Sequence, residues 1–161
     1  EKMDILINEG IGLMGYVAFV MLVAAGFAGV LKSTGGIDTM VQGLIPFMMG
    51  SKLLAAFLML VVGLFITIGI GTSFGTIPIL AVLFVPVFIK LGFNPMEAIV
   101  VFAAAAALGD AGSPASGTTL GPTAGLNVDG QHEHIKDTCI PTFLHYNIPL
   151  ILFAILAIII F

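Results

Sequence analysis

The stretch GIGTSFGTIP, residues 69–78, divides one long uncharged run of the sequence and decides how that run can fold. The run covers residues 53–89, which is too long for one membrane-spanning helix of about 20 apolar residues. It is long enough for two close-packed helical segments. Glycine lowers helix propensity and Pro78 lacks a backbone donor, so the helix is expected to break here. The sequence therefore predicts two helices joined at GTSFGT, residues 71–76, which we call the first break.

Composition places the whole chain in a lipid bilayer. Of its 161 residues 59 % are hydrophobic and only 9 % are charged, whereas soluble domains carry about 25 % charged residues. Such a chain cannot cover a water-facing surface, which excludes an ordinary globular enzyme and a disordered tail. Without a basic stripe we expect no nucleic-acid partner. The expected class is an all-α, multi-pass protein of the cell (inner or plasma) membrane.

Two further uncharged runs are each expected to span the membrane as one helix, at residues 10–31 and 138–161. A loop at residues 32–52, with a short interfacial helix, follows the first of them. The expected division is a transmembrane helix with an interfacial linker (residues 1–50) and a second unit (51–161). That unit contains a re-entrant helical hairpin (51–92), a broken helix (95–128) and a last transmembrane helix (138–161).

A second break, GDAGSPASGTTLGP at residues 109–122, follows a half-length helix expected over residues 96–108. Irregular backbone at membrane depth persists only where it is buried in protein or lines a water-filled cavity. Freed carbonyls and hydroxyls supply the oxygen ligands that Na+ prefers, so two such breaks predict a binding site. The alternative for the first break is a tight turn between two full spans.

Asp110 is the one carboxylate between residues 98 and 128. An ionisable residue inside a membrane segment indicates ion or proton coupling. The alternative is that Asp110 caps the helix that follows, through Ser113 or neighbouring N–H groups. The hydroxyls of Ser113, Ser116, Thr118 and Thr119 are candidate oxygen ligands, with helix–helix packing as their alternative.

Polar residues near the C-terminus are weaker candidates. His145 and Asn147 in the last span are possible ligands, with packing as the alternative. His132 and His134 flank Glu133 without the H-E-x-x-H spacing of metalloproteases, so they are expected in a solvated loop, DGQHEHIKD at residues 129–137. Glu97, in a first helical turn, is expected to suit the helix dipole.

The order of these motifs resembles Na+/H+ antiporters of the NhaC type, in the wider ion transporter superfamily. GTSFGT at residues 71–76 precedes GD at 109–110, SP at 113–114, Ser116 and TT at 118–119, and HIKDT at 134–138 leads into a Pro-containing helix. The resemblance covers about residues 50–150. It implies one half of an inverted-repeat, elevator-type transporter. We expect this chain to be an excised C-terminal half whose partners are the missing N-terminal half and a second copy in a homodimer.

The resemblance also implies that the two breaks surround a sodium and substrate site. We expect Na+ or H+ as coupling ion, no other cofactor, and sodium ligands Thr72, Ser73, Asp110, Ser116 and Thr118. The expected site residues are Gly71, Thr72, Ser73, Gly75, Thr76, Asp110, Ser113, Pro114, Ser116, Thr118 and Thr119.

Gly117 is one departure from the pattern, because NhaC-type antiporters usually read SDTT where this chain reads SGTT. Loss of that carboxylate favours an organic anion or zwitterion whose own carboxylate completes the sodium shell. An amino-acid permease-like branch fits this best, and Na+/H+ exchange without an organic substrate is the alternative. GTSFG also matches G-x-S-x-G, with His145 as a base, but a nucleophile elbow needs a strand–turn–helix context. An intramembrane serine protease is thus a remote alternative, and no enzyme activity is expected.

Overall fold

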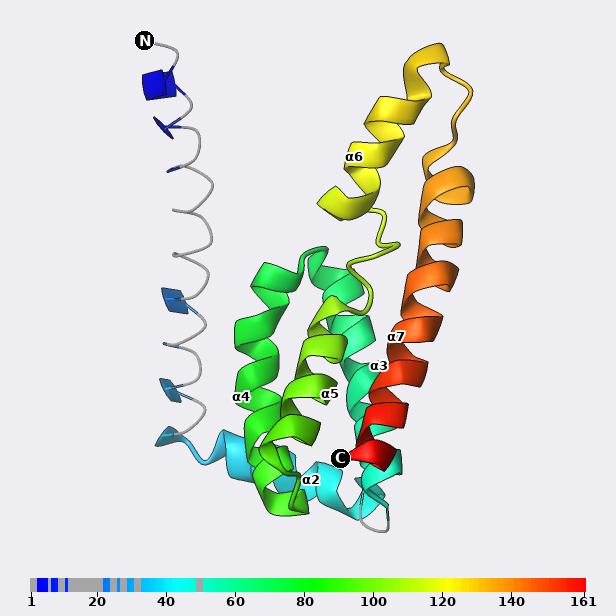
Figure 1. Ribbon diagram of the computed structural model, residues 1–161. Coiled ribbons are helices and arrows are strands. Elements are labelled where there is room, and N and C mark those ends of the chain that lie inside the picture. Colours follow the sequence, from blue (N-terminus) through cyan, green and yellow to red (C-terminus); the bar gives the residue numbers. More distant parts are fainter. Residues whose placement is uncertain are drawn as a thin grey trace.

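The computed structural model describes residues 3–5, 7–8, 11, 22–23, 26, 29–30, 33–48 and 51–161. Every regular element within these residues is a helix (Figure 1), so the predicted all-α class is confirmed for this part of the chain. The span expected over residues 10–31 lies largely outside the described residues. In chain order the helices are α2 (Gly36–Met48), α3 (Lys52–Ile70), α4 (Ser73–Leu91), α5 (Pro95–Ala107), α6 (Gly117–Leu126), η1 (Asn127–Asp129), η2 (His134–Cys139) and α7 (Ile140–Ile160).

Three helical segments in the described part of the chain are long and apolar enough to cross a membrane. They are α3, α4 and the continuous helix formed by η2 and α7. Large apolar side chains on these helices face outward, among them Phe65, Ile89 and Phe153. Lipid tails are as apolar as these side chains, so outward exposure of this kind is normal in a bilayer. With 13 residues, α5 is too short to cross alone, because a span needs about 20 residues.

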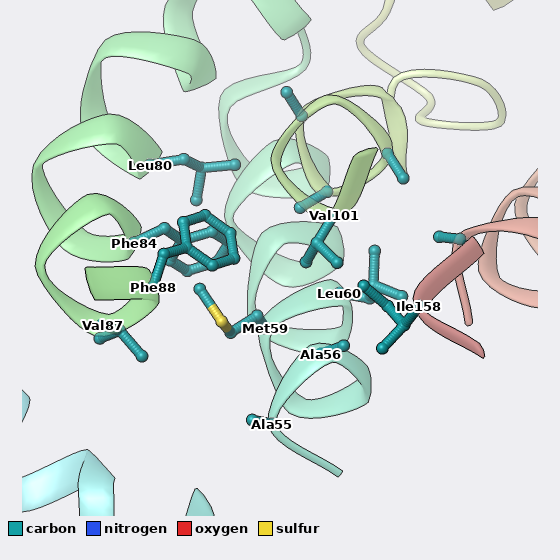
Figure 2. Close-up of a cluster of buried hydrophobic side chains, with 14 of the residues drawn as sticks. Ala55, Ala56, Met59, Leu60, Leu80, Phe84, Val87, Phe88, Val101 and Ile158 are labelled. Atoms are coloured by element: carbon teal, nitrogen blue, oxygen red, sulfur yellow. The ribbon is translucent and has the colours of Figure 1, made fainter. Parts of the chain in front are cut away.

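The described core lies between α3, α4, α5 and α7, at the end of the bundle that α2 crosses in Figure 1. Figure 2 shows Met59 and Leu60 of α3 meeting Phe84 of α4, Val101 of α5 and Ile158 of α7. Association of helices in lipid rests on van der Waals packing rather than on the hydrophobic effect. Dense packing at this end holds the four helices as a rigid support for the irregular backbone at the other end.

Small residues let α5 approach α3 closely. A Cβ atom placed on Gly63 would lie 2.6 Å from the Cβ atom of Ala105, which is closer than two carbon atoms can pack. Helices in membranes use small residues in this way to bring their backbones together. The alanine run of α5 therefore fixes the distance between α3 and the start of the second break.

A polar contact ties α3 to α5 at the end that carries α2. Asn94 and Glu97 form a reciprocal capping box at the N-terminus of α5, so the predicted place of Glu97 in a first helical turn is observed. The Nζ atom of Lys52 also lies 3.0 Å from Oε2 of Glu97, whose side chain is buried. This ion pair gives the buried carboxylate a partner, which a sequence argument from the helix dipole alone does not reveal.

The helices extend further into the glycine- and proline-rich segments than the sequence suggests. Pro78 and Pro86 lie inside α4, and Pro122 lies inside α6. Each proline removes one backbone hydrogen bond, and the helix continues through the remaining ones. The last helix begins at His134 rather than at residue 138, with a π-helical turn drawn from the expected loop. The irregular backbone is therefore shorter than predicted.

Candidate functional site

The two breaks meet at the end of the α3, α4 and α5 bundle that lies opposite α2 (Figure 1). Within the first break only Gly71 and Thr72 are non-helical, since α3 ends at Ile70 and α4 begins at Ser73. Residues 108–116 connect α5 to α6 across the second break. The C-termini of α3 and α5 and the N-termini of α4 and α6 thus gather in one place.

Asp110 joins the two breaks. Its Oδ2 atom accepts a 3.2 Å hydrogen bond from the backbone N–H of Ser73 and a second bond from the Ser73 hydroxyl. Its Oδ1 atom accepts a hydrogen bond from the hydroxyl of Ser116. Ser73 is the first residue of α4, so the carboxylate sits at a helix N-terminus, where the macrodipole favours negative charge. Asp110 therefore does cap a helix, but this helix is α4 and not the one that follows it in sequence.

The N-terminus of α6 turns toward the same carboxylate. Ser116 is the N-cap of α6, and its Oγ atom accepts a hydrogen bond from the backbone N–H of Thr118 at 3.1 Å. The hydroxyls of Ser116 and Thr118 lie 2.8 Å apart, and the Thr118 hydroxyl donates to the backbone oxygen of Asp110 at 2.8 Å. Ser73, Asp110, Ser116 and Thr118 form one hydrogen-bonded group, which we call the Asp110 cluster. The side-chain atoms of these four residues that lie within hydrogen-bonding distance of one another are all oxygens.

Asn147 of α7 holds the unwound backbone beside this cluster. Its Oδ1 atom accepts a hydrogen bond from the N–H of Gly109 at 3.0 Å, and its Nδ2 atom donates to the oxygen of Ala111 at 2.9 Å. The side chain is buried. A single amide thus provides partners for two backbone groups that no helix can satisfy here. We call Asn147 a positioning residue, because it touches Asp110's neighbours on both sides.

Two glycines let the second break pack directly against α3 and α7. Gly109 and Gly112 have φ values of 82° and 104°, in the left-handed region that L side chains rarely adopt. A Cβ atom at Gly109 would lie 2.7 Å from the backbone oxygen of Leu64, and one at Gly112 would lie 2.5 Å from the Cβ atom of Phe143. The path of the chain through Asp110 is therefore fixed on both sides by close backbone contact.

The hydroxyls of other expected site residues bond to backbone oxygens and not to the Asp110 carboxylate. The Thr119 hydroxyl donates to the backbone oxygens of Ser113 and Ser116, and the Ser113 hydroxyl donates to the oxygen of Ile68 at 3.4 Å. Thr76 bonds back to the oxygen of Thr72 at 2.8 Å within α4. These hydroxyl–carbonyl hydrogen bonds hold the backbone around the two breaks in its observed path. Gly71 and Gly75 are buried, with Gly71 packed near Ala115.

Comparison with known proteins now decides the family. The model of the Na+/H+ antiporter family matches residues 1–156 of the chain. The chain belongs to the Na+/H+ antiporter family. The family match, the three candidate spans and the membrane-protein relatives described next make it a multi-pass membrane protein, as the sequence predicts. No solved structure matches the chain.

Three curated relatives share more than half of their aligned residues with this family member. An uncharacterized membrane protein of Vibrio parahaemolyticus is 59 % identical over 93 % of the chain and 34 % of its own length. A Bacillus subtilis protein, "Putative amino acid transporter YuiF", is 56 % identical over 98 % of the chain and 36 % of its own length. An uncharacterized membrane protein of Haemophilus influenzae is 53 % identical over 98 % of the chain and 35 % of its own length. The chain therefore spans about a third of the length of these relatives.

The remaining candidates of this antiporter-family chain lie apart from the Asp110 cluster. His145 is exposed on α7, and its Nδ1 atom donates to the oxygen of Pro141 at 2.7 Å within its own helix. Pro114 is exposed, and its backbone oxygen accepts a 2.9 Å hydrogen bond from Nε2 of His134. From the sequence His134 is expected in a solvated loop, whereas in the structure it begins η2 and contacts the second break. The sequence signal for this contact is HIKDT at residues 134–138. This segment follows α6 and begins the helix that leads back along the bundle, so it is placed beside the second break.

Proposed function

We propose that this chain forms part of a secondary active transporter that couples Na+ or H+ to the movement of a small organic substrate, an amino acid. The observation that carries the proposal is the Asp110 cluster, in which one carboxylate links two helix breaks through Ser73 and Ser116. Two breaks that meet in an apolar helical bundle are the usual design of a secondary-transporter site. Membership of the Na+/H+ antiporter family supports the same class of activity.

The cluster offers the chemistry that a sodium ion needs. Na+ binds oxygen atoms, and the cluster holds a carboxylate together with the hydroxyls of Ser73, Ser116 and Thr118. Each hydroxyl has two lone pairs and a hydrogen that rotates about its C–O bond. We propose that Na+ enters as a transported ion when the serine hydroxyls turn their hydrogens away from Asp110. A proton on Asp110 is the equivalent state for H+ coupling.

The substrate assignment rests on space and on helix polarity. Gly117 is the first residue of α6, and a Cβ atom placed on it meets no atom within 4 Å. The N-termini of α4 and α6 both lie at the cluster, and such helix ends attract carboxylates. We propose that an amino-acid carboxylate occupies the open position beside Gly117. The name of the Bacillus subtilis relative, "Putative amino acid transporter YuiF", agrees with this substrate class.

The same proposal includes a re-entrant hairpin and an elevator mechanism. In Figure 1 the tip between α3 and α4 lies well short of the far ends of α6 and η2. The η2–α7 helix has 27 residues and α3 has 19, lengths of roughly 40 Å and 28 Å respectively at a rise of 1.5 Å per residue. The difference in length agrees with a tip that lies below the far end of the η2–α7 helix. We also propose that the rest of the transporter completes the site and that the whole protein is a homodimer.

The proposal is tested by current on solid-supported membranes that carry proteoliposomes of the full-length protein. Amino acids and dicarboxylates are applied with and without Na+. We expect a current that an amino acid evokes and that requires Na+ or a proton gradient. A protein that is silent toward all of these compounds, yet changes the luminal pH after a Na+ jump, would be a Na+/H+ exchanger without an organic substrate.

Gly117→Asp gives a sharper test of the substrate assignment. The new carboxylate would occupy the open position and repel the substrate carboxylate, so we expect at least a tenfold lower amino-acid current, about 1.4 kcal/mol of like-charge repulsion. Gly121→Asp is the matched control, because Gly121 lies one turn later on α6 and is equally open. Equal currents in both variants would place the substrate elsewhere.

The context of Ser73 does not support the protease alternative. Ser73 follows α3, a helix, so the strand–turn–helix arrangement of a nucleophile elbow is replaced by a helix–turn–helix. The Ser73 hydroxyl donates to Asp110 rather than to a histidine base.

A further inference from the structure

A groove of about 460 Å³ runs along the contact between α5 and α7, and we call it the α5–α7 groove. Every described side chain that lines it is apolar. Two bulky lining residues are largely exposed, Ile99 at 61 % and Phe153 at 69 %. The groove therefore offers holes beside large side chains, the kind of surface into which another helix packs its own side chains. Small residues make up half of the lining, namely Ala103, Ala104 and Ala107 of α5 and Ala154 of α7.

The groove face of α5 differs from the lipid-facing surface of its neighbour α3. Ala103 and Ala107 lie four residues apart, so they fall on the same side of α5, whereas α3 exposes a large side chain, Phe65, at 70 %. Small residues on a membrane helix let a second backbone approach closely. The same alanine run already has that role at Ala105, which packs on Gly63 of α3. The groove face thus has the composition of a helix contact rather than of a lipid-facing surface.

The position of the groove also argues against lipid as its occupant. The groove reaches Ala107, the last residue of α5, and the unwound backbone of the second break begins at the next residue, Leu108. Irregular backbone at membrane depth is covered by protein or lines a water-filled cavity, and it does not face lipid. An acyl chain lying in the groove would extend up to this backbone, whereas a helix would cover it.

We propose that a membrane-spanning helix from the part of the transporter outside these 161 residues packs in the α5–α7 groove. The chain spans about a third of the length of its curated relatives, so a protein of their length has further segments to pack against it. Because the described lining carries no charge, the facing side of that helix is uncharged and presents aliphatic side chains. The inference rests on the proposed function only in taking the rest of the transporter as the partner, and it needs neither the substrate nor the coupling ion.

Photocrosslinking of the full-length protein in proteoliposomes tests the occupant directly. Phe153→p-benzoylphenylalanine places a photoreactive ring in the groove with little change of side-chain shape, so the protein should fold. We expect a product with the mass of one chain, in which position 153 is joined to a peptide outside residues 1–161. Phe65→p-benzoylphenylalanine is the matched control, since Phe65 is exposed to the same extent and does not line the groove. Its products should be mainly lipid adducts.

The identity of the crosslinked partner decides between the possible occupants. Adducts of position 153 with lipid alone would overturn the inference. A product with twice the mass of one chain would do the same, because it identifies a second copy, and so would a crosslink to a peptide within residues 1–161. Crosslinking requires no transport, so the absence of an amino-acid current would contradict the proposed function and not this contact.

Ala103→Phe distinguishes a helix from lipid by a different measurement. The groove of this chain has room for the new ring, since a cavity of about 150 Å³ holds benzene. Fluid acyl chains would move aside for the ring, whereas a packed helix could not, so we expect the folding equilibrium constant of the full-length protein to fall about tenfold. Leu152→Phe is the control, because Leu152 is 64 % exposed on α7 and does not line the groove. Its folding constant should stay within about twofold of wild type, and equal stability of the two variants would contradict a helix in the groove.

Discussion

Asp110→Asn is expected to abolish substrate-evoked current, with a loss of about 100-fold or more, while the protein remains folded. The loss corresponds to roughly 2–3 kcal/mol, which is typical of replacing a charged hydrogen-bond partner by a neutral one. Asparagine keeps the size of the side chain and one acceptor oxygen, so Ser73 retains a partner for its backbone N–H. What disappears is the charge that a coupling ion requires.

This substitution separates the two roles of Asp110. As helix caps, asparagine and aspartate are about equally good, so a carboxylate that only caps α4 would tolerate the change. Asp129→Asn is the control, since Asp129 accepts a hydrogen bond from Gln131 in an exposed loop and should keep wild-type current. Current is measured in proteoliposomes, and folding by the unfolding midpoint. Wild-type transport by Asp110→Asn would show that Asp110 serves the fold alone.

Asn147→Leu is expected to have the second large effect, on stability and on transport together. Leucine has the same branching and the same number of side-chain heavy atoms as asparagine but no polar atoms, so the N–H of Gly109 and the oxygen of Ala111 lose their partners. Each buried group without a partner costs about 1–3 kcal/mol. We expect a free energy of unfolding lower by roughly 2–6 kcal/mol and a current too small to detect.

Tyr146→Phe controls for changes in α7 at the adjacent position, because Tyr146 is exposed. Its unfolding midpoint and its current should match those of the wild type. Asn147→Asp adds a readout specific to positioning: it keeps the acceptor for Gly109 but presents an acceptor to the Ala111 oxygen. This variant should raise the substrate concentration for half-maximal current more than it lowers the midpoint. If Asn147→Leu transports normally, Asn147 does not position the second break.

The two breaks can be located from the sequence because their cause is local. Glycine, proline and small polar residues inside apolar runs are visible without knowing what packs around them. Their length cannot be read in the same way, since Pro78 and Pro122 lie within helices in which each proline removes only one hydrogen bond. The role of Asp110 is likewise open at the level of sequence. Neither the helix that Asp110 caps nor the partner of its carboxylate can be read from adjacent residues.

Hydropathy, helix breaks and family membership were therefore determined by the sequence itself, because each depends on residue types and their order. The tertiary structure decided which groups meet. Ser73 and Asp110 are 37 residues apart, Asn147 and Gly109 are 38 apart, and His134 and Pro114 are 20 apart. Contacts at such separations depend on how α3, α5 and α7 pack, and that packing is set by close approaches such as Gly63 on Ala105. A bond between distant residues forms only after many apolar contacts have fixed the helices that carry them.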